Sequence, residues 1–325
     1  MEDVTDTVFR QVIAEAGRPD VFFTEFTNVE GMDSPGSDEV AQRLKFTKGE
    51  RPIVAQIWGR DPKKFLVAAT TLKAMGFDGI DINFGCPVRD VVKRGACAAM
   101  IDPEYRSQVG EILVAVKEGA ADLPVSVKTR IGVRQIATEE WIGFLLTQGL
   151  AAITIHGRTA VQMSEGQVDW AEIGKAVALR NQVFGLPGLQ TRVLDSRKRG
   201  PAARARFASL PPFTLIVGNG DVESRQEALE KVAQYGVDGV MIGRGVFKNP
   251  WVFSRSDQTK SKPDRMKLLS RHVNLWSETW GDQKHFAVFK KYIKMYVNGF
   301  DGAADLRAQL MATKSLAELE TAIAG

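Results

Sequence analysis

The sequence predicts an α/β fold of the (β/α)8, or TIM-barrel, class that lacks its first strand. Seven short apolar runs recur along the chain, and each is closed by a polar or glycine-containing turn. Amphipathic segments of helical period, such as 61–75 and 224–235, separate most of these runs. Alternation this regular indicates a parallel sheet, and seven or eight such units favour a closed barrel. The predicted strands are 21–24, 53–57, 79–83, 125–128, 152–156, 215–218 and 239–242.

The first expected strand is missing because the chain opens on a loop-like acidic segment. A helix carrying Val8, Val12 and Ile13 follows this segment directly. A barrel without its first strand would expose a parallel edge, which is costly and promotes association. We therefore expect an incomplete start rather than a functional truncation.

The strand pattern stops near Pro250, so the barrel is predicted over residues 1–250. Basic amphipathic helices over 264–279, 284–296 and 304–311 predict a small helical domain over 251–325. Residues 183–212 connect a helix to a strand through an arginine-, proline- and alanine-rich stretch. Because connections of this length are uncommon in barrels, we expect a disordered insert outside the barrel.

Composition favours a globular cytoplasmic protein. Of the 325 residues, 44% are hydrophobic and 25% are charged, and no apolar run approaches the roughly 20 residues that cross a bilayer. The acidic N-terminus argues against a secretory signal. Two cysteines provide no disulfide framework, and three histidines with two cysteines match no zinc motif, so we expect no metal.

Basic residues are concentrated in two places, although the net charge is only +4. Residues 183–212 carry six basic side chains against one acidic one, and residues 254–298 carry ten against four. Two basic regions on a near-neutral body suggest an extended polyanion as partner. The alternative is a solvated helix face together with a disordered loop.

The segment from Asp81 to Pro87 holds a cysteine at the end of a strand. Asn83 ends a β-branched run, and three residues later Cys86 lies in a Gly-Cys-Pro turn. Glycine allows the sharp bend and proline fixes the backbone after the cysteine. A thiol held at this place could give or take a proton, or it could pack as a small hydrophobe.

Other polar residues close the following strands, and in a barrel these strand ends meet at the active-site face. Two glycine-rich turns, 218–221 and 243–245, follow the last two strands, where backbone amides and the next helix N-terminus favour a phosphate such as that of FMN. Lys128 could stabilise an anionic reduced flavin. The alternatives are a salt bridge for Lys128 and a core position for His156. The strand-end residues are Gln56, Asn83, Lys128, His156 and Asn219.

Taken together, these motifs resemble the tRNA-dihydrouridine synthases. The resemblance covers nearly the whole chain except 183–212, and it includes the ordered segments 1–6, 55–56, 81–87, 93–99, 125–130, 156–159, 218–222 and 243–253. It continues through 279–282, 286–291 and 298–302, which are similar to the family's helical RNA-binding domain.

The resemblance implies roles for individual residues. Cys86 would protonate C5 of the target uracil, Asn83 would contact the base, and Arg158 would lie near the substrate. Met1 falls where the family has a Pro-Met pair at the flavin, and here the proline is missing. Cys97 stands where many relatives have glycine, so we interpret it as packing. The implied flavin contacts are Gln56, Lys128 and His156, with Asn219, Gly220, Asp221, Gly243 and Arg244 around the FMN phosphate and ribityl chain.

The expected reaction is reduction of uridine in tRNA by FMN, with NADPH as reductant, in a monomer. The target base must leave the tRNA stack, and basic residues of the helical domain, among them Lys290, Lys291 and Lys294, would contact phosphates. Two other functions stay open. One is an FMN barrel that reduces a small pyrimidine, and the other is a non-catalytic RNA-binding relative.

Overall fold

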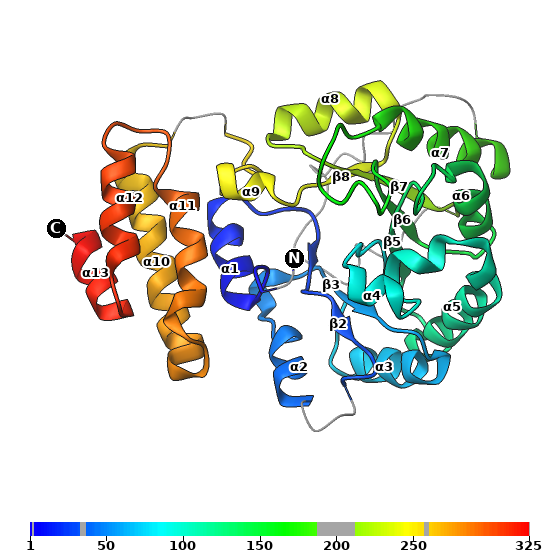
Figure 1. The fold of residues 1–325 in the computed structure, drawn as a ribbon, viewed down its shortest axis with the longest axis horizontal. Coiled ribbons are helices and arrows are strands. Elements are labelled where there is room, and N and C mark those ends of the chain that lie inside the picture. Colours follow the sequence, from blue (N-terminus) through cyan, green and yellow to red (C-terminus); the bar gives the residue numbers. More distant parts are fainter. Residues whose placement is uncertain (2, 33–36, 187–211, 257–259, 325) are drawn as a thin grey trace.

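The protein contains a curled parallel sheet with helices on its outer face (Figure 1). The structure is a computed structural model that describes residues 1, 3–32, 37–186, 212–256 and 260–324. The predicted insert lies almost wholly outside these residues. Each of the seven predicted strands is confirmed, and all the pairings are parallel. The strands are β1 Phe22–Phe23, β2 Thr27–Asn28, β3 Ile53–Trp58, β4 Gly79–Phe84, β5 Val125–Arg130, β6 Ala152–His156, β7 Leu215–Asn219 and β8 Gly239–Met241.

The sheet follows the order β1-β3-β4-β5-β6-β7-β8 and, within the described residues, β1 and β8 form its two ends. This curled parallel sheet is of the barrel type that the sequence predicts. The sequence did not predict β2, which pairs with β3 beyond β1 and continues the same strand position. Between β1 and β2, the Thr24 hydroxyl accepts a hydrogen bond from the backbone N–H of Gln56 at 3.0 Å, in place of a backbone carbonyl. The side chain therefore interrupts the strand.

Alternation along β4 and β5 decides which residues face the helices. Ile80, Ile82 and Phe84 are buried. Phe84 lies edge-on to Trp141 of helix α6 (Thr138–Leu146), with 6.1 Å between ring centroids. The intervening residues of these strands therefore face the inside of the curled sheet. The helices that follow the strands are α3 Pro62–Ala74, α5 Arg106–Ala120, α6 Thr138–Leu146, α7 Trp170–Val183 and α8 Arg225–Tyr235.

The sequence signals helix starts at several of these elements. Asp61, Asp169 and Ser224 each accept a hydrogen bond from a backbone amide in the first turn of α3, α7 and α8, respectively. The shorter helices are α1 Thr7–Ala16, α2 Ser37–Arg43, α4 Arg89–Lys93 and α9 Gly245–Lys248, with 3-10 turns at Lys48–Glu50, Cys97–Ile101, Pro103–Tyr105 and Gly281–Gln283.

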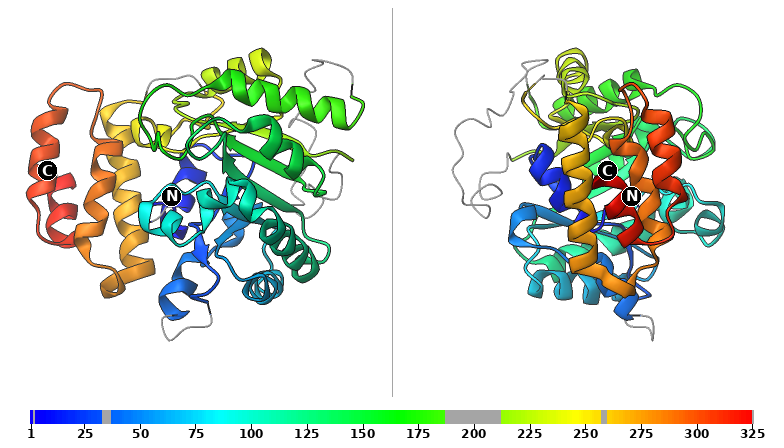
Figure 2. Two further views of the ribbon diagram at one scale, coloured as in Figure 1. Left: turned by 45° about the vertical axis from the view of Figure 1, so that its right-hand side comes forward. Right: turned by 90° about the vertical axis from the view of Figure 1, so that its left-hand side faces the viewer.

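The C-terminal part of the chain is helical and lies beside α1 and α9 (Figures 1 and 2). Its first helix starts at a capping box formed by Ser261 and Asp264. The helix expected over 284–296 is mostly a 3-10 helix, Phe286–Tyr292, that runs into the short α11. No helix in the described part of the chain has the length and apolar character to span a membrane. The helices are α10 Lys262–Trp280, α11 Ile293–Tyr296, α12 Ala303–Ala312 and α13 Leu316–Ala324.

The N-terminal segment joins the sheet to the C-terminal helices. Asp6 caps α1 and also accepts hydrogen bonds from Trp280 Nε1 at 2.9 Å and Lys284 Nζ at 2.8 Å. Arg10 forms a fully buried ion pair with Glu50 at 2.6 Å. Breaking a buried pair leaves an uncompensated charge, so these contacts fix the position of the first residues.

Candidate active site

The parallel register brings the predicted strand-end residues together. Asn83 of β4 lies opposite Lys128 of β5, and His156 of β6 lies opposite Asn219 of β7. Gln56 of β3 reaches this row through its side chain, because its Oε1 accepts a hydrogen bond from Asn83 Nδ2 at 3.1 Å. The five residues therefore form one polar cluster across five neighbouring strands, in which His156 and Asn219 lie two residues further along their strands than the level of Asn83 and Lys128.

The cysteine turn is held by Asn83. Its Oδ1 accepts hydrogen bonds from the backbone amides of Gly85 at 2.8 Å and Cys86 at 3.0 Å. Behind Asn83, Gln56 Nε2 donates to Asp81 Oδ2 at 2.7 Å, and Ser126 Oγ donates to Asp81 Oδ1 at 2.6 Å. The position of the thiol thus depends on a chain of hydrogen bonds that begins in the sheet.

Arg130 is a site residue that the sequence analysis did not single out. Its Nε donates to Gly85 O at 2.7 Å, and its Nη1 donates to Thr159 O at 2.9 Å and to Met163 O at 2.8 Å. The side chain therefore ties the cysteine turn to the loop after β6. The available signal was its spacing, since Arg130 lies two residues beyond Lys128 and shares its face of the strand.

Lys128 and His156 differ in charge. Lys128 Nζ donates to Asn219 Oδ1 at 2.9 Å, and Asn219 Nδ2 donates in turn to Met241 O at 2.8 Å. Burial, with Arg130 nearby, lowers the pKa of Lys128 to about 8, so the ammonium keeps its proton at neutral pH. Burial and the charge of Lys128 lower the pKa of His156 to about 2, so its ring is neutral.

Asp221 is the acidic residue among these cations. Its carboxylate accepts hydrogen bonds from Arg158 Nη2 and, at 2.7 Å, from Arg244 Nη2. The hydrogen bond from Arg158 is the main cause of the lowered pKa of Asp221. Arg158 is itself buried and also donates to the carbonyl oxygens of Glu165 and Gly166. Its guanidinium is thus fixed at the inner edge of the site, while Arg244 is exposed.

The two cysteines of the chain lie next to each other. Cys86 is half-buried and Cys97 is buried, and the Ala98 amide donates to Cys86 O at 3.3 Å. A side-chain hydrogen bond with Cys86, together with burial, raises the pKa of Cys97 well above its usual value. Cys97 has a φ of +52°, a conformation that glycine adopts at lower cost. Its burial agrees with the packing role predicted for it.

Two glycines shape the space at the last strand ends. Gly220 has a φ of +136°, and a Cβ there would lie 2.6 Å from Val168 Cγ1 and 3.1 Å from His156 Cδ2. A Cβ on Gly243 would meet no heavy atom within 4 Å, so its backbone borders open space. The helix that follows the turn 243–245 is α9, which has only four residues.

Met1 and the three tail lysines are held by the N-terminal segment and the C-terminal helices, and not by strand ends. The Met1 amine donates to Thr5 Oγ1 at 2.8 Å. Lys290, Lys291 and Lys294 lie on the C-terminal helices and, with Arg307, line a cavity of about 520 Å³. Lys290 Nζ donates to Met311 O at 2.8 Å, and Lys291 Nζ donates to Asp3 O.

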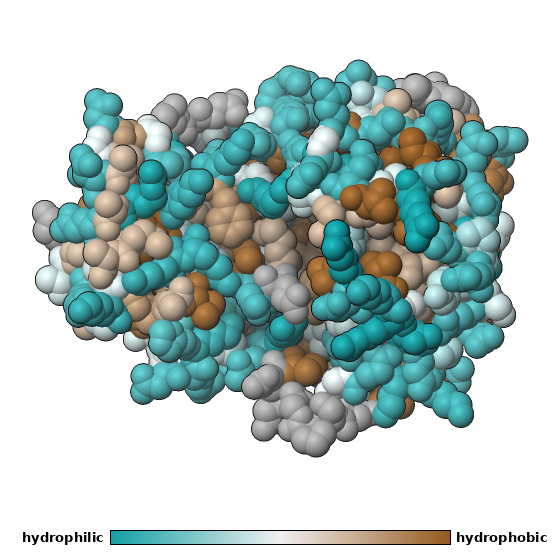
Figure 3. Space-filling model, in the orientation of Figure 1, coloured by the Kyte–Doolittle hydropathy of each residue, from teal (hydrophilic) through white to brown (hydrophobic). Residues whose placement is uncertain are grey.

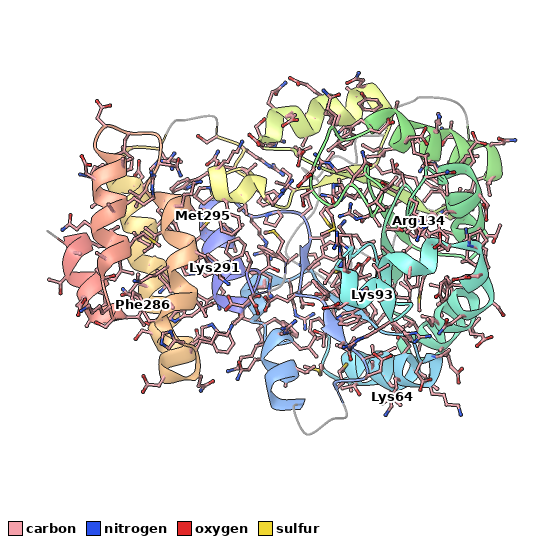
Figure 4. The ribbon with its side chains drawn as sticks, in the orientation of Figure 1. Lys64, Lys93, Arg134, Phe286, Lys291 and Met295 are labelled. Carbon is pink, nitrogen blue, oxygen red and sulfur yellow. The ribbon has the colours of Figure 1, made fainter. Side chains whose placement is uncertain are left out.

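One face of the molecule combines these features. Figure 3 shows a face that is hollowed near its centre, with both hydrophobic and hydrophilic residues around the hollow. In the same orientation, Lys291 lies on the helical side, while Lys93 and Arg134 lie on the sheet side (Figure 4). Basic side chains thus border this face on both sides. The described residues contain no group of three or more metal-ligating side chains.

Comparisons with known proteins identify relatives along nearly the whole chain. The "Probable tRNA-dihydrouridine synthase" of Staphylococcus epidermidis is 41% identical over 322 residues, covering 98% of this chain and 89% of that protein. The "Probable tRNA-dihydrouridine synthase 2" of Bacillus subtilis is 41% identical over 323 residues, covering 98% of this chain and 90% of that protein. Among solved structures, a morphinone reductase in complex with tetrahydroNAD matches with a TM-score of 0.46 and 11% identity, covering 77% of this chain and 81% of that one.

A family model agrees with the relatives. The model described as "Dihydrouridine synthase (Dus)" matches residues 1–183 and 207–324. The unmatched stretch, residues 184–206, falls within the predicted insert 183–212. The match spans both the sheet and the C-terminal helices. The chain belongs to the dihydrouridine synthase family.

Proposed function

We propose that this protein is a tRNA-dihydrouridine synthase that reduces the C5=C6 bond of specific uridines in tRNA, with FMN as cofactor and NADPH as reductant. The family and the names of its relatives support the reaction. In this proposal residues 1–250 hold the flavin, residues 251–325 bind tRNA, and the enzyme acts as a cytoplasmic monomer without a metal.

The side chains at the strand ends fit a flavin phosphate ester. Four cations, Lys128, Arg130, Arg158 and Arg244, lie around a neutral His156 and the carboxylate of Asp221. Gly220 and Gly243 allow a phosphate or ribityl chain to approach the backbone. When bound, FMN supplies the hydride for C6. The residues that would hold it are Met1, Gln56, Lys128, His156, Asn219, Gly220, Asp221, Gly243 and Arg244.

Lys128 has the electrostatic role in this arrangement. Its hydrogen bond to Asn219 fixes the ammonium, and a fixed cation costs no reorganisation when negative charge develops beside it. His156 is neutral, so it can accept or donate a hydrogen bond, and it adds no second positive charge beside Lys128.

Cys86 is the proposed proton donor to C5. The thiol lies in a turn held from one side by Asn83 and from the other by Arg130. Because its position is fixed, the proton can be delivered to one face of a base that enters the hollow. Asn83 and Arg158 would lie beside the base.

The C-terminal helices would hold the tRNA by its phosphates. Among the described residues that line the cavity beside Lys290, Lys294 and Arg307, none is acidic, so the cavity suits a polyanion. Lys291 contributes charge to the same place and also holds Asp3 of the N-terminal segment. Phosphate contacts position the RNA while the target base turns out of its stack.

The observation that carries the proposal is the hydrogen-bonded row from the Cys86 turn to Gln56, with Lys128 opposite Asn83. Purified protein should show flavin absorbance and, with NADPH, should add dihydrouridine to unmodified tRNA, as measured by nucleoside mass spectrometry. Reduction of free uridine but not of tRNA would favour an enzyme for small pyrimidines. Absence of flavin and of product would favour the non-catalytic alternative.

A further inference from the structure

Asp81 has no role in the proposed reaction, yet its carboxyl group is placed at the base of the site. It lies on β4 on the same side as Asn83, and its side chain is fully buried. A buried carboxylate costs stability, and an apolar residue of similar size would fill the space at lower cost. The hydrogen bonds of Asp81 show what the carboxylate adds.

The hydrogen bonds from Asp81 to the cysteine turn all run in one direction. An ionised carboxylate only accepts, so Gln56 must present its Nε2 to Asp81, as it does at 2.7 Å. The Gln56 Oε1 is then left to accept from Asn83 Nδ2 at 3.1 Å. Asn83 Oδ1 is left in turn for the amides of Gly85 and Cys86.

The cysteine turn, at the other end of this chain of hydrogen bonds, requires the same direction of donation. Backbone amides only donate, so the turn is stabilised only while Asn83 presents its oxygen to it. If either amide side chain flipped, two donors or two acceptors would face each other inside the sheet. A carboxylate at one end and two N–H groups at the other therefore select a single orientation of the two amides.

We propose that Asp81 is a positioning residue that fixes the orientation of the Gln56 and Asn83 amides and thereby the turn that presents Cys86. The inference rests on the proposed function, in which Cys86 acts on the bound base. Ser126 supports the role, because its hydroxyl donates to the second carboxylate oxygen at 2.6 Å and so fixes the plane of the carboxyl group.

Two substitutions at Asp81 separate orientation from charge. In Asp81→Asn, the new Nδ2 can donate to Ser126 Oγ and Oδ1 can still accept from Gln56, so the direction is kept. In Asp81→Leu, Gln56 Nε2 loses its acceptor inside the sheet. Each variant is loaded with FMN and reduced with dithionite without oxygen, and the rate at which unmodified tRNA reoxidises the flavin is measured.

We expect Asp81→Leu to slow reoxidation about tenfold or more at unchanged FMN content, because the Gln56 amide loses the acceptor that fixes its orientation. Asp81→Asn should stay within about threefold of the wild type, because that acceptor is kept. Equal rates for Asp81→Leu and the wild type would overturn the proposal. Reoxidation that is as slow in Asp81→Asn as in Asp81→Leu would also overturn it. If the wild type itself is not reoxidised by tRNA, the proposed function fails instead.

A compensating pair of substitutions tests the same chain of hydrogen bonds, from Asp81 through Gln56 to Asn83, without tRNA. Asn83→Asp places an acceptor against Gln56 Oε1, which should lower the melting temperature and the retention of FMN. Adding Asp81→Asn allows the whole chain to reverse, so both values should recover. A Gln56→Met background removes this chain of hydrogen bonds. There Asp81→Asn should raise the melting temperature only by the gain that it gives in otherwise wild-type protein, and should not restore the retention of FMN. Equal recovery in that background would mean simple repulsion between two carboxylates and would contradict the proposal.

Discussion

Lys128 on β5 donates a hydrogen bond to Asn219 on β7, across the whole width of β6, with 2.9 Å between Nζ and Oδ1. The contact holds a cation at the centre of the strand ends, beside a neutral His156. It also links the half of the sheet that carries the cysteine turn to the half that carries the glycine turns.

Binding of FMN should weaken as the pH rises through the pKa of Lys128. This pKa is lowered to about 8 by burial, so the free protein loses the ammonium above that pH. An anionic ligand favours the charged form, so the dissociation constant should be flat between about pH 7, where the FMN phosphate is fully ionised, and about pH 8. Above pH 8 it should rise by up to about tenfold per pH unit. Fluorescence titration of the apoprotein measures this.

The matched control is Lys128→Met, which should bind FMN more weakly and without the break near pH 8. A break that persists in this variant would assign the titration to another group. Arg130, whose pKa burial lowers only to about 10, titrates above this window.

Replacing Asp81 by Asn should stabilise the protein near neutral pH. Burial raises the folded-state pKa of Asp81 from 3.8 to about 6. The folded state therefore holds the proton more tightly, and its stability falls as the pH rises from about 4 to about 6. At 1.36 kcal/mol per pKa unit the loss is about 3 kcal/mol above pH 6.

Urea unfolding of the wild type and of Asp81→Asn at several pH values measures this difference. The advantage of the variant should grow between about pH 4 and pH 6 and stay constant above. A difference that does not depend on pH would show that the carboxyl group titrates normally. Ser126→Ala should instead extend the pH dependence to higher pH, because the carboxyl group stays buried and loses a hydrogen bond that lowers its pKa.

Charge reversal on the C-terminal helices should weaken tRNA binding. Lys290→Glu with Lys294→Glu removes two cations that line the same cavity. Affinity should fall, and the slope of log K against log salt should become less steep, by about 0.9 for each phosphate that the protein no longer neutralises. Lys291 is left unchanged because it also holds Asp3.

Charge reversal at both Lys63 and Lys64 of α3 is the control. Figure 4 shows Lys64 on the sheet side of the molecule, away from the C-terminal helices. The control should bind tRNA almost as the wild type does. Equal weakening by both pairs would indicate a general charge effect and not a binding surface. FMN content should not change in either variant.

Much of the fold could be predicted because local sequence determines it. The β-branched runs ending at Asn83, Lys128 and His156 are strands close to the expected bounds. The strand β2 could not be predicted, because it depends on pairing with β3 and on a Thr24 hydroxyl that interrupts the ladder. Such contacts join residues distant in sequence.

The site shows the same division. Residues at strand ends could be identified from their position, but the links between them could not. The chain from Asp81 through Gln56 to Asn83 depends on the register of two strands, and the contact of Arg130 with Gly85 depends on a third. The contact of Asp6 with Trp280 spans almost the whole chain, so no local pattern could indicate it.

The most direct measurement compares wild-type protein with Cys86→Ala in a single turnover, starting from reduced flavin and unmodified tRNA and following dihydrouridine by mass spectrometry. Both proteins should hold FMN and accept electrons from NADPH equally well. Without the proton donor, dihydrouridine should form about a hundredfold more slowly or worse. Formation at the wild-type rate would contradict the role of Cys86 and the function built on it.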